Sequence, residues 1–218
     1  MMTDYQFREE IEIKVRDVTL AGNLNIPMRS DSIVIFAHGS GSSRHSSRNK
    51  YVAEVLNEAG FSTLLFDLLT TQEDQNYSRR FQIELLSERL VEVTHWVQAR
   101  PDFDLNIGYF GASTGAAATL EAAALLGDTV RAVVSRGGRP DLAMYNLPIV
   151  KCPTLLIVGG LDDEVIRLNK KAYNELKAEK ELVIIEGASH LFEEPGKLEE
   201  VAACATKWFL KHLRHVYV

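Results

Sequence analysis

Apolar and polar positions follow two different patterns along the chain. Near the N-terminus, apolar residues alternate with polar ones over Glu10–Val15 and again over Thr19–Ile26, and Asp17 lies between the two runs. Such alternation is typical of strands with one buried face, so the pair predicts an antiparallel hairpin that Pro27 ends. From residue 32 onward, apolar runs are continuous or follow a helical period, which favours a sheet covered on both faces.

Short apolar runs and longer amphipathic segments alternate from residue 32 to the end of the chain. Strands are predicted at 32–37, 61–66, 105–110, 130–135, 153–158 and 182–185, and helices at 49–59, 79–100, 165–178 and 195–213, with an alanine-rich helix that ends at Gly127. Repeated strand–helix units predict an α/β fold with a mostly parallel central sheet and helices on both faces. Because no internal repeat or linker interrupts them, we expect one domain over residues 1–218.

Composition narrows the possible partners. The 218 residues are 46% hydrophobic and 25% charged, with a net charge of −6 whose acids and bases are interspersed. This balance argues against a nucleic-acid surface, and no apolar stretch is long enough to span a bilayer. The first ten residues do not resemble a signal peptide, and two cysteines form neither a disulfide framework nor a metal-ligand spacing. We therefore expect a cytoplasmic protein without a metal site.

One predicted strand runs directly into a glycine-rich turn. Residues 111–115 read Gly-Ala-Ser-Thr-Gly, after the apolar residues 107–110 and before the alanine-rich helix. This strand–turn–helix context of G-x-S-x-G predicts that Ser113 is an exposed nucleophile on a sharp turn, where side chains at the glycine positions would collide. The structural alternative is a plain turn in which Ser113 or Thr114 caps the helix.

A serine nucleophile requires a base, and the base requires an acid that orients it. Asp162 and Asp163 follow the strand predicted at 153–158, and His190 follows the strand predicted at 182–185. Functional residues of parallel sheets lie beyond the C-terminal ends of the strands, so these side chains are expected to meet Ser113 at one edge. The structural alternatives are aspartates that cap the following helix and a histidine that caps the last one.

Four motifs together resemble a known family. They are His-Gly-Ser-Gly from residue 38, Gly-Ala-Ser-Thr-Gly from 111, Gly-Gly-Leu-Asp-Asp-Glu-Val from 159 and Gly-Ala-Ser-His-Leu-Phe from 187. With the chain order Ser, Asp, His, nearly the whole chain resembles the dienelactone-hydrolase-like group of small α/β-hydrolases without a large lid. The group's G-x-x-D-x-x-V pattern places the acid at Asp162, with Asp163 as runner-up. Its founding members carry a cysteine nucleophile where this chain has Ser113, so the resemblance implies hydrolase chemistry without specifying a dienelactone.

Two backbone N–H groups are expected to form an oxyanion hole. One belongs to Thr114 at the start of the helix that follows Ser113, and the resemblance places the other at Ser40, in the loop after residues 32–37. Each such donor is worth ~3 kcal/mol of barrier. His38 is expected to hold this loop in place, and the alternative is a plain glycine–serine turn.

The predicted mechanism is acyl transfer through Ser113 without a cofactor, acting on a small soluble ester or lactone. Because the segment available for a lid is short (136–150), an open site is expected. Arg44, Arg136 and Arg139 are predicted to lie in loops on the same side as Ser113, where they could hold a substrate carboxylate; salt bridges within the protein are the alternative.

Other functions share these residues. A peptidase or an acyltransferase would use the same acyl-enzyme, and a hydrolase fold can also serve a non-catalytic binding or sensor protein. Labelling of Ser113 by a serine-directed phosphonate separates the enzymes from the binding protein. A monomer or small homo-oligomer is expected.

Overall fold

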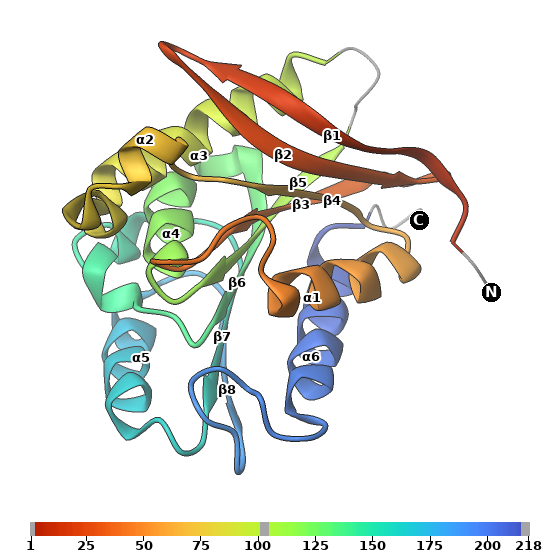
Figure 1. The fold of residues 1–218 in the computed structure, drawn as a ribbon. Helices are drawn as coiled ribbons and strands as arrows, with labels where there is room; N and C mark the ends of the chain where they lie inside the picture. The colour runs from red at the N-terminus through yellow and green to blue at the C-terminus, as the bar shows by residue number, and fades with distance from the viewer. Residues whose placement is uncertain (1–2, 101–104, 215–218) are drawn as a thin grey trace.

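The computed structural model describes residues 3–100 and 105–214. In these residues eight strands form one sheet in the order β1-β2-β4-β3-β5-β6-β7-β8 (Figure 1). The strands are β1 (Tyr5–Val15), β2 (Val18–Pro27), β3 (Ser32–Ala37), β4 (Ser62–Phe66), β5 (Asn106–Ala112), β6 (Val130–Arg136), β7 (Thr154–Gly159) and β8 (Lys180–Ile185). β2 pairs antiparallel with β1 and β4, and the remaining neighbours pair in parallel. The predicted α/β class, mostly parallel sheet and N-terminal hairpin are confirmed.

Helices cover both faces of the sheet (Figure 1). They are α1 (Ser47–Glu58), α2 (Thr71–Asp74), α3 (Ile83–Gln98), α4 (Thr114–Leu126), α5 (Asp163–Glu175) and α6 (Lys197–His212). α1 and α6 pack on one face, and α3, α4 and α5 pack on the other. None of the helices in the described residues is long and apolar enough to cross a membrane.

The core consists of an apolar cluster on each face of the sheet. The face under α1 and α6 buries Phe36, Phe110 and Val134, whereas the opposite face buries Ile35 and Tyr109. Neighbours in one strand thus contribute to opposite faces, as the period of a strand requires. Full burial of such side chains contributes about 1.5–3 kcal/mol each, which explains why the predicted strands were continuous apolar runs.

Two boundaries differ from the predictions by four residues or more. β1 begins at Tyr5 and not at residue 10. Its first half lies at the edge of the sheet with mostly exposed side chains, and it is held there by backbone pairing with β2, which the apolar pattern does not reveal. α3 begins at Ile83 and not at residue 79. The residues before it form a 3₁₀ helix (Tyr77–Phe81) whose N-cap side chain, Asn76, accepts the amide hydrogen of Ser78.

The connection after β6 is short. Residues 137–153 carry two 3₁₀ helices, Pro140–Ala143 and Leu147–Ile149, and no large insertion. The parallel strands β3, β5, β6, β7 and β8 end at the same edge of the sheet, and the short connection leaves this edge without a lid. The predicted catalytic residues lie in the loops at this edge.

Candidate active site

Ser113 lies on a strained turn between β5 and α4. Its backbone has φ 51° and ψ −121°, a conformation that is unfavourable for any residue with a side chain. Two backbone hydrogen bonds tie it to the end of β6 and the segment that follows: the Ser113 amide donates to the Arg136 carbonyl at 3.2 Å, and the Arg139 amide donates to the Ser113 carbonyl at 3.0 Å. The segment after β6 thus helps to fix the orientation of the serine.

Glycines on either side of Ser113 allow this turn to pack closely. A Cβ on Gly111 would lie 2.5 Å from Cα of Ala116, and a Cβ on Gly115 would lie 2.2 Å from the carbonyl oxygen of Ala37. Both contacts are far too short for real atoms. The predicted requirement for glycine therefore has its physical cause in α4 lying against β5 and β3.

Asp162 and His190 form a hydrogen-bonded pair from two distant loops. Asp162 Oδ2 lies 2.6 Å from His190 Nδ1. Asp162 occupies the N-cap position of α5, yet its side chain makes no capping hydrogen bond, so its carboxylate serves the histidine instead. Asp163 is exposed as the first residue of α5 and forms no hydrogen bond with His190 among the described residues. With Nδ1 donating to the carboxylate, Nε2 of the neutral ring is free to accept a proton.

The loop that carries His190 is held by residues that the sequence analysis missed. The Glu194 carboxylate accepts the Ser189 amide hydrogen at 3.0 Å, and this bond lowers the pKa of Glu194. A Cβ on Gly137 would lie 3.1 Å from the His190 carbonyl oxygen and 3.5 Å from its Cε1. The Gly-Gly pair at 137–138 was the available signal, because adjacent glycines often mark a close backbone approach. Arg136 therefore binds the backbone of Ser113, and the next residue, Gly137, lies against His190, so one short segment contacts both residues.

The Ser113 hydroxyl forms no hydrogen bond with His190 in the part of the chain described. In ligand-free sites such bonds are commonly long and tighten only when substrate is bound. The arrangement therefore provides a strained serine and an oriented base at one sheet edge.

The loop after β3 lies directly over Ser113. His38 Nδ1 donates to the Gly39 carbonyl at 2.9 Å, and its Nε2 accepts the Leu68 amide hydrogen at 3.1 Å. These two bonds require a neutral ring, and burial lowers the pKa of His38 in agreement with them. A Cβ on Gly39 would lie 3.0 Å from Cβ of Ser113, so a larger residue would push the loop and Ser113 apart by a few tenths of an ångström.

The structure brings Ser40 to Thr114, with one difference from expectation. The Ser40 amide donates to Oγ1 of Thr114 at 2.9 Å, so the amide hydrogen that was expected to face the oxyanion is bound by a side-chain hydroxyl of α4. Only the backbone of Thr114 was expected to take part. Nothing in the linear sequence indicated this contact, because it joins residues 74 positions apart.

Two of the three predicted substrate-binding arginines are already paired. Arg44 binds Asp67 through its amide at 2.8 Å and through Nη1 at 2.7 Å. Arg139 binds both carboxylate oxygens of Asp141 at 2.9 Å. These pairs match the salt-bridge alternative for both residues.

Arg136 differs from the other two arginines. It is the last residue of β6, where the prediction had a loop, and it is only 7% exposed. Its Nη2 donates to Asn49 Oδ1 at 3.3 Å, while Nε and Nη1 are buried without a hydrogen-bond partner among the described residues. Burial and the nearby charge of Arg48 lower the pKa of Arg136 to about 10. A buried guanidinium without a carboxylate is electrostatically unfavourable unless an anion joins it.

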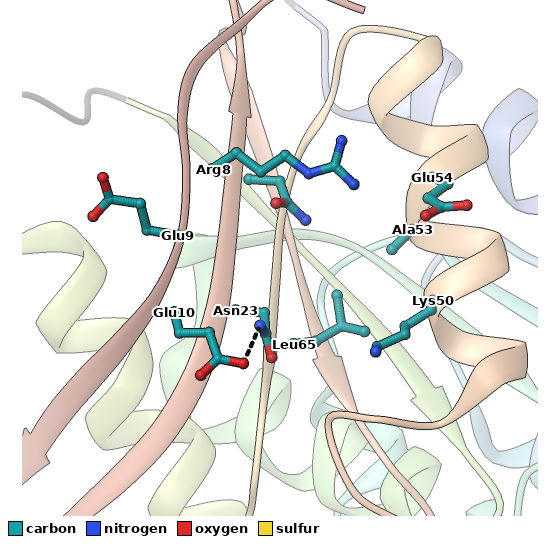
Figure 2. A pocket seen from close by; sticks show the side chains of 9 residues that line it. Arg8, Glu9, Glu10, Asn23, Lys50, Ala53, Glu54 and Leu65 are labelled. Carbon is teal, nitrogen blue, oxygen red and sulfur yellow. Dashed lines mark hydrogen bonds between the residues drawn. The ribbon is translucent and has the colours of Figure 1, made fainter.

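A separate hollow lies between the hairpin and α1, away from Ser113 (Figure 2). Figure 2 shows Arg8 of β1 extending toward Glu54 of α1, while Asn23 donates to Glu10 at 3.5 Å. Its lining comprises Arg8, Glu9, Glu10, Asn23, Asn25, Lys50, Ala53, Glu54 and Leu65. None of these side chains is a nucleophile held beside a base, so the hollow is not the catalytic centre.

Comparisons with known proteins identify the family and the fold. Residues 18–215 match the family described as the dienelactone hydrolase family. The crystal structure of a dienelactone hydrolase from Anabaena variabilis is 56% identical, with a TM-score of 0.93 over 97% of this chain and 100% of that one. Est1E from Butyrivibrio proteoclasticus is 18% identical with a TM-score of 0.81, covering 93% and 98% of the two chains, and shares the fold.

A curated Mycobacterium tuberculosis relative bears a different name. It is 56% identical over 94% of this chain and carries the provisional name phosphoribosyl transferase. The match covers 46% of that protein, so this chain spans about half the length of the curated relative.

Proposed function

Because this chain belongs to the dienelactone hydrolase family, we propose that it is a serine hydrolase that cleaves a small ester or lactone through an acyl-enzyme on Ser113. One observation carries the proposal. A carboxylate is held 2.6 Å from Nδ1 of His190, at the same sheet edge as a serine with φ 51°. A binding protein gains nothing from a strained serine beside an oriented histidine, whereas covalent catalysis requires both.

The proposed reaction has two steps. Ser113 Oγ attacks the carbonyl carbon, its proton passes to His190 Nε2, and the carbonyl π electrons move onto oxygen. The intermediate collapses, the bond to the alcohol breaks, and His190 returns the proton to the departing alkoxide. Water then attacks the acyl-enzyme in the same way, and the carboxylic acid leaves. Asp162 keeps the ring in the required tautomer and stabilises the imidazolium.

The finer proposal concerns the substrate. The connection after β6 carries no large insertion, which favours a small or extended molecule over a long acyl chain that needs an enclosing lid. Since Arg44 and Arg139 are paired with carboxylates of the chain, the anion-binding hypothesis now rests on Arg136. We propose that Arg136 binds the carboxylate of an acidic substrate.

The transferase name of the curated relative does not change the hydrolase proposal for this chain. That name applies to a protein about twice the length of this chain, and this chain covers 46% of it. We propose hydrolase chemistry for the shared part. Peptidase and acyltransferase reactions would use the same acyl-enzyme, and a panel of substrates separates them.

The deciding experiment is intact-mass measurement after incubation with a small fluorophosphonate, with Ser113→Ala as the control. One adduct on the wild type, none on the variant, and turnover of short esters or lactones would support the proposal. Ser113→Ala should lose nearly all ester turnover with an unchanged circular dichroism spectrum. No adduct and no turnover in the wild type would refute the serine mechanism.

A further inference from the structure

The side chain of Thr114 has an uncommitted proton beside the nucleophile. Thr114 is the first residue of α4 and is 4% exposed. Its Oγ1 accepts the Ser40 amide hydrogen at 2.9 Å, and among the described residues the hydroxyl has no acceptor for its own hydrogen. A hydroxyl can accept and donate at once, so its one donor hydrogen is unused.

Other threonines within helices show why this one is unusual. Thr94 donates to the Leu90 carbonyl at 2.8 Å, and Thr119 and Thr206 donate to carbonyls in the preceding turn at the same distance. Such back-bonding is the ordinary behaviour of a helical threonine. Thr114 cannot do this, because no helical turn precedes the first residue of α4. Its proton therefore stays available at the helix N-terminus, where negative charge is favoured.

The position of the hydroxyl also affects the neighbouring amide. If Oγ1 did nothing but accept the Ser40 N–H, it would occupy one of the two expected oxyanion donors. Loss of one donor typically costs a hydrolase about 10²–10³-fold in kcat. A hydroxyl that accepts the Ser40 N–H and also donates its own hydrogen to the oxyanion avoids this loss. Consecutive hydrogen bonds polarise one another, so the Ser40 amide strengthens the hydroxyl as a donor.

We propose that the Thr114 hydroxyl is a catalytic donor in the oxyanion hole. Its oxygen accepts the Ser40 N–H, and its own hydrogen is donated to the developing oxyanion, an arrangement called the relay below. This inference rests on the proposed function of Ser113. As the carbonyl π electrons move onto oxygen, that oxygen accepts hydrogen bonds from the Thr114 amide and from Thr114 Oγ1–H. The hydroxyl proton stays on Thr114, while the Ser113 proton passes to His190.

The test compares Thr114→Val, which has nearly the same shape but no hydroxyl, with Thr114→Ser, which keeps it. On 4-nitrophenyl acetate, Thr114→Val should lower kcat roughly 10- to 100-fold with KM within about twofold of wild type, since the freed Ser40 amide recovers part of the loss. Thr114→Ser should remain within about threefold of wild type. Circular dichroism verifies folding, and Thr114→Ala replaces the valine variant if that one does not fold.

A second substrate separates donation from a structural role. In a thionoester, sulfur replaces the carbonyl oxygen and accepts hydrogen bonds weakly. The ester-to-thionoester ratio of kcat should fall roughly 10- to 100-fold in Thr114→Val and stay unchanged in Thr114→Ser. A loop that was merely displaced would slow both substrates equally and leave the ratio intact, which would overturn the proposal.

The remaining outcomes are also decisive. Equal or faster turnover by Thr114→Val would show that the hydroxyl blocks the Ser40 amide, and equal impairment of the valine and serine variants would show that it donates nothing. Both refute the relay while leaving the serine mechanism intact. A wild type that gives no phosphonate adduct refutes the proposed function itself, and the relay with it.

Discussion

Replacing Asp162 with asparagine tests the acid of the proposed triad. The carboxylate oxygen lies 2.6 Å from His190 Nδ1, and the two side chains are 17% and 39% exposed. With about 4 Å between charge centres and an effective dielectric of about 20, the carboxylate stabilises the imidazolium by ~4 kcal/mol. At ~1.36 kcal/mol per decade, this loss is about 10³-fold in rate. Asparagine also no longer enforces the tautomer, which moves the expected loss toward ~10⁴-fold.

The matched control is Asp163→Asn, which makes the same chemical change one residue along the chain. Asp163 is exposed at the start of α5, so its loss should cost about 0.3–1 kcal/mol of stability and leave activity within about twofold. The assay is kcat/KM for a short ester across both variants and the wild type, together with thermal unfolding. If Asp163→Asn lost as much activity as Asp162→Asn or more, the assignment of the acid and the electrostatic reasoning would both be wrong.

Three further changes test other parts of the site. Gly115→Ala places a Cβ 2.2 Å from a carbonyl oxygen of β3, so we expect about 3 kcal/mol of destabilisation in thermal unfolding, and an unchanged midpoint would contradict the close packing. Burial lowers the pKa of His38 below its value of about 6.5 in the unfolded chain, so the unfolded state takes up the proton first as pH falls. The contribution of His38 to stability should be fully present above that pH and be lost below it by up to ~1.4 kcal/mol per pH unit, so urea titrations of His38→Gln should show a smaller decline than the wild type. Arg136→Gln should raise KM for acidic esters more than for neutral ones, whereas Arg139→Gln, a residue already paired, should not; equal effects would remove the anion site.

The fold and the strained turn at Ser113 were predictable because their determinants are local. β3 and β7 are uninterrupted apolar runs with both faces buried, and period alone identifies them. Ser113 was recognisable because a strand, two glycines and a small-residue helix must adjoin to form its turn. The predicted start of α3 was wrong because the Asn76 side chain caps a short 3₁₀ helix that replaces the first turn of the predicted α-helix. Helix propensity does not reveal which of the two forms.

The sequence by itself determined the architecture, the strained serine and the chain order of the candidate triad. Tertiary structure decided which polar atoms meet. It pairs Asp162 rather than Asp163 with His190, occupies Arg44 with Asp67, and brings the Thr114 hydroxyl to the Ser40 amide. The physical reason is range: turn strain and apolar period arise between neighbours in the chain, whereas a hydrogen bond depends on positions within a few tenths of an ångström, which only the packing of distant loops sets.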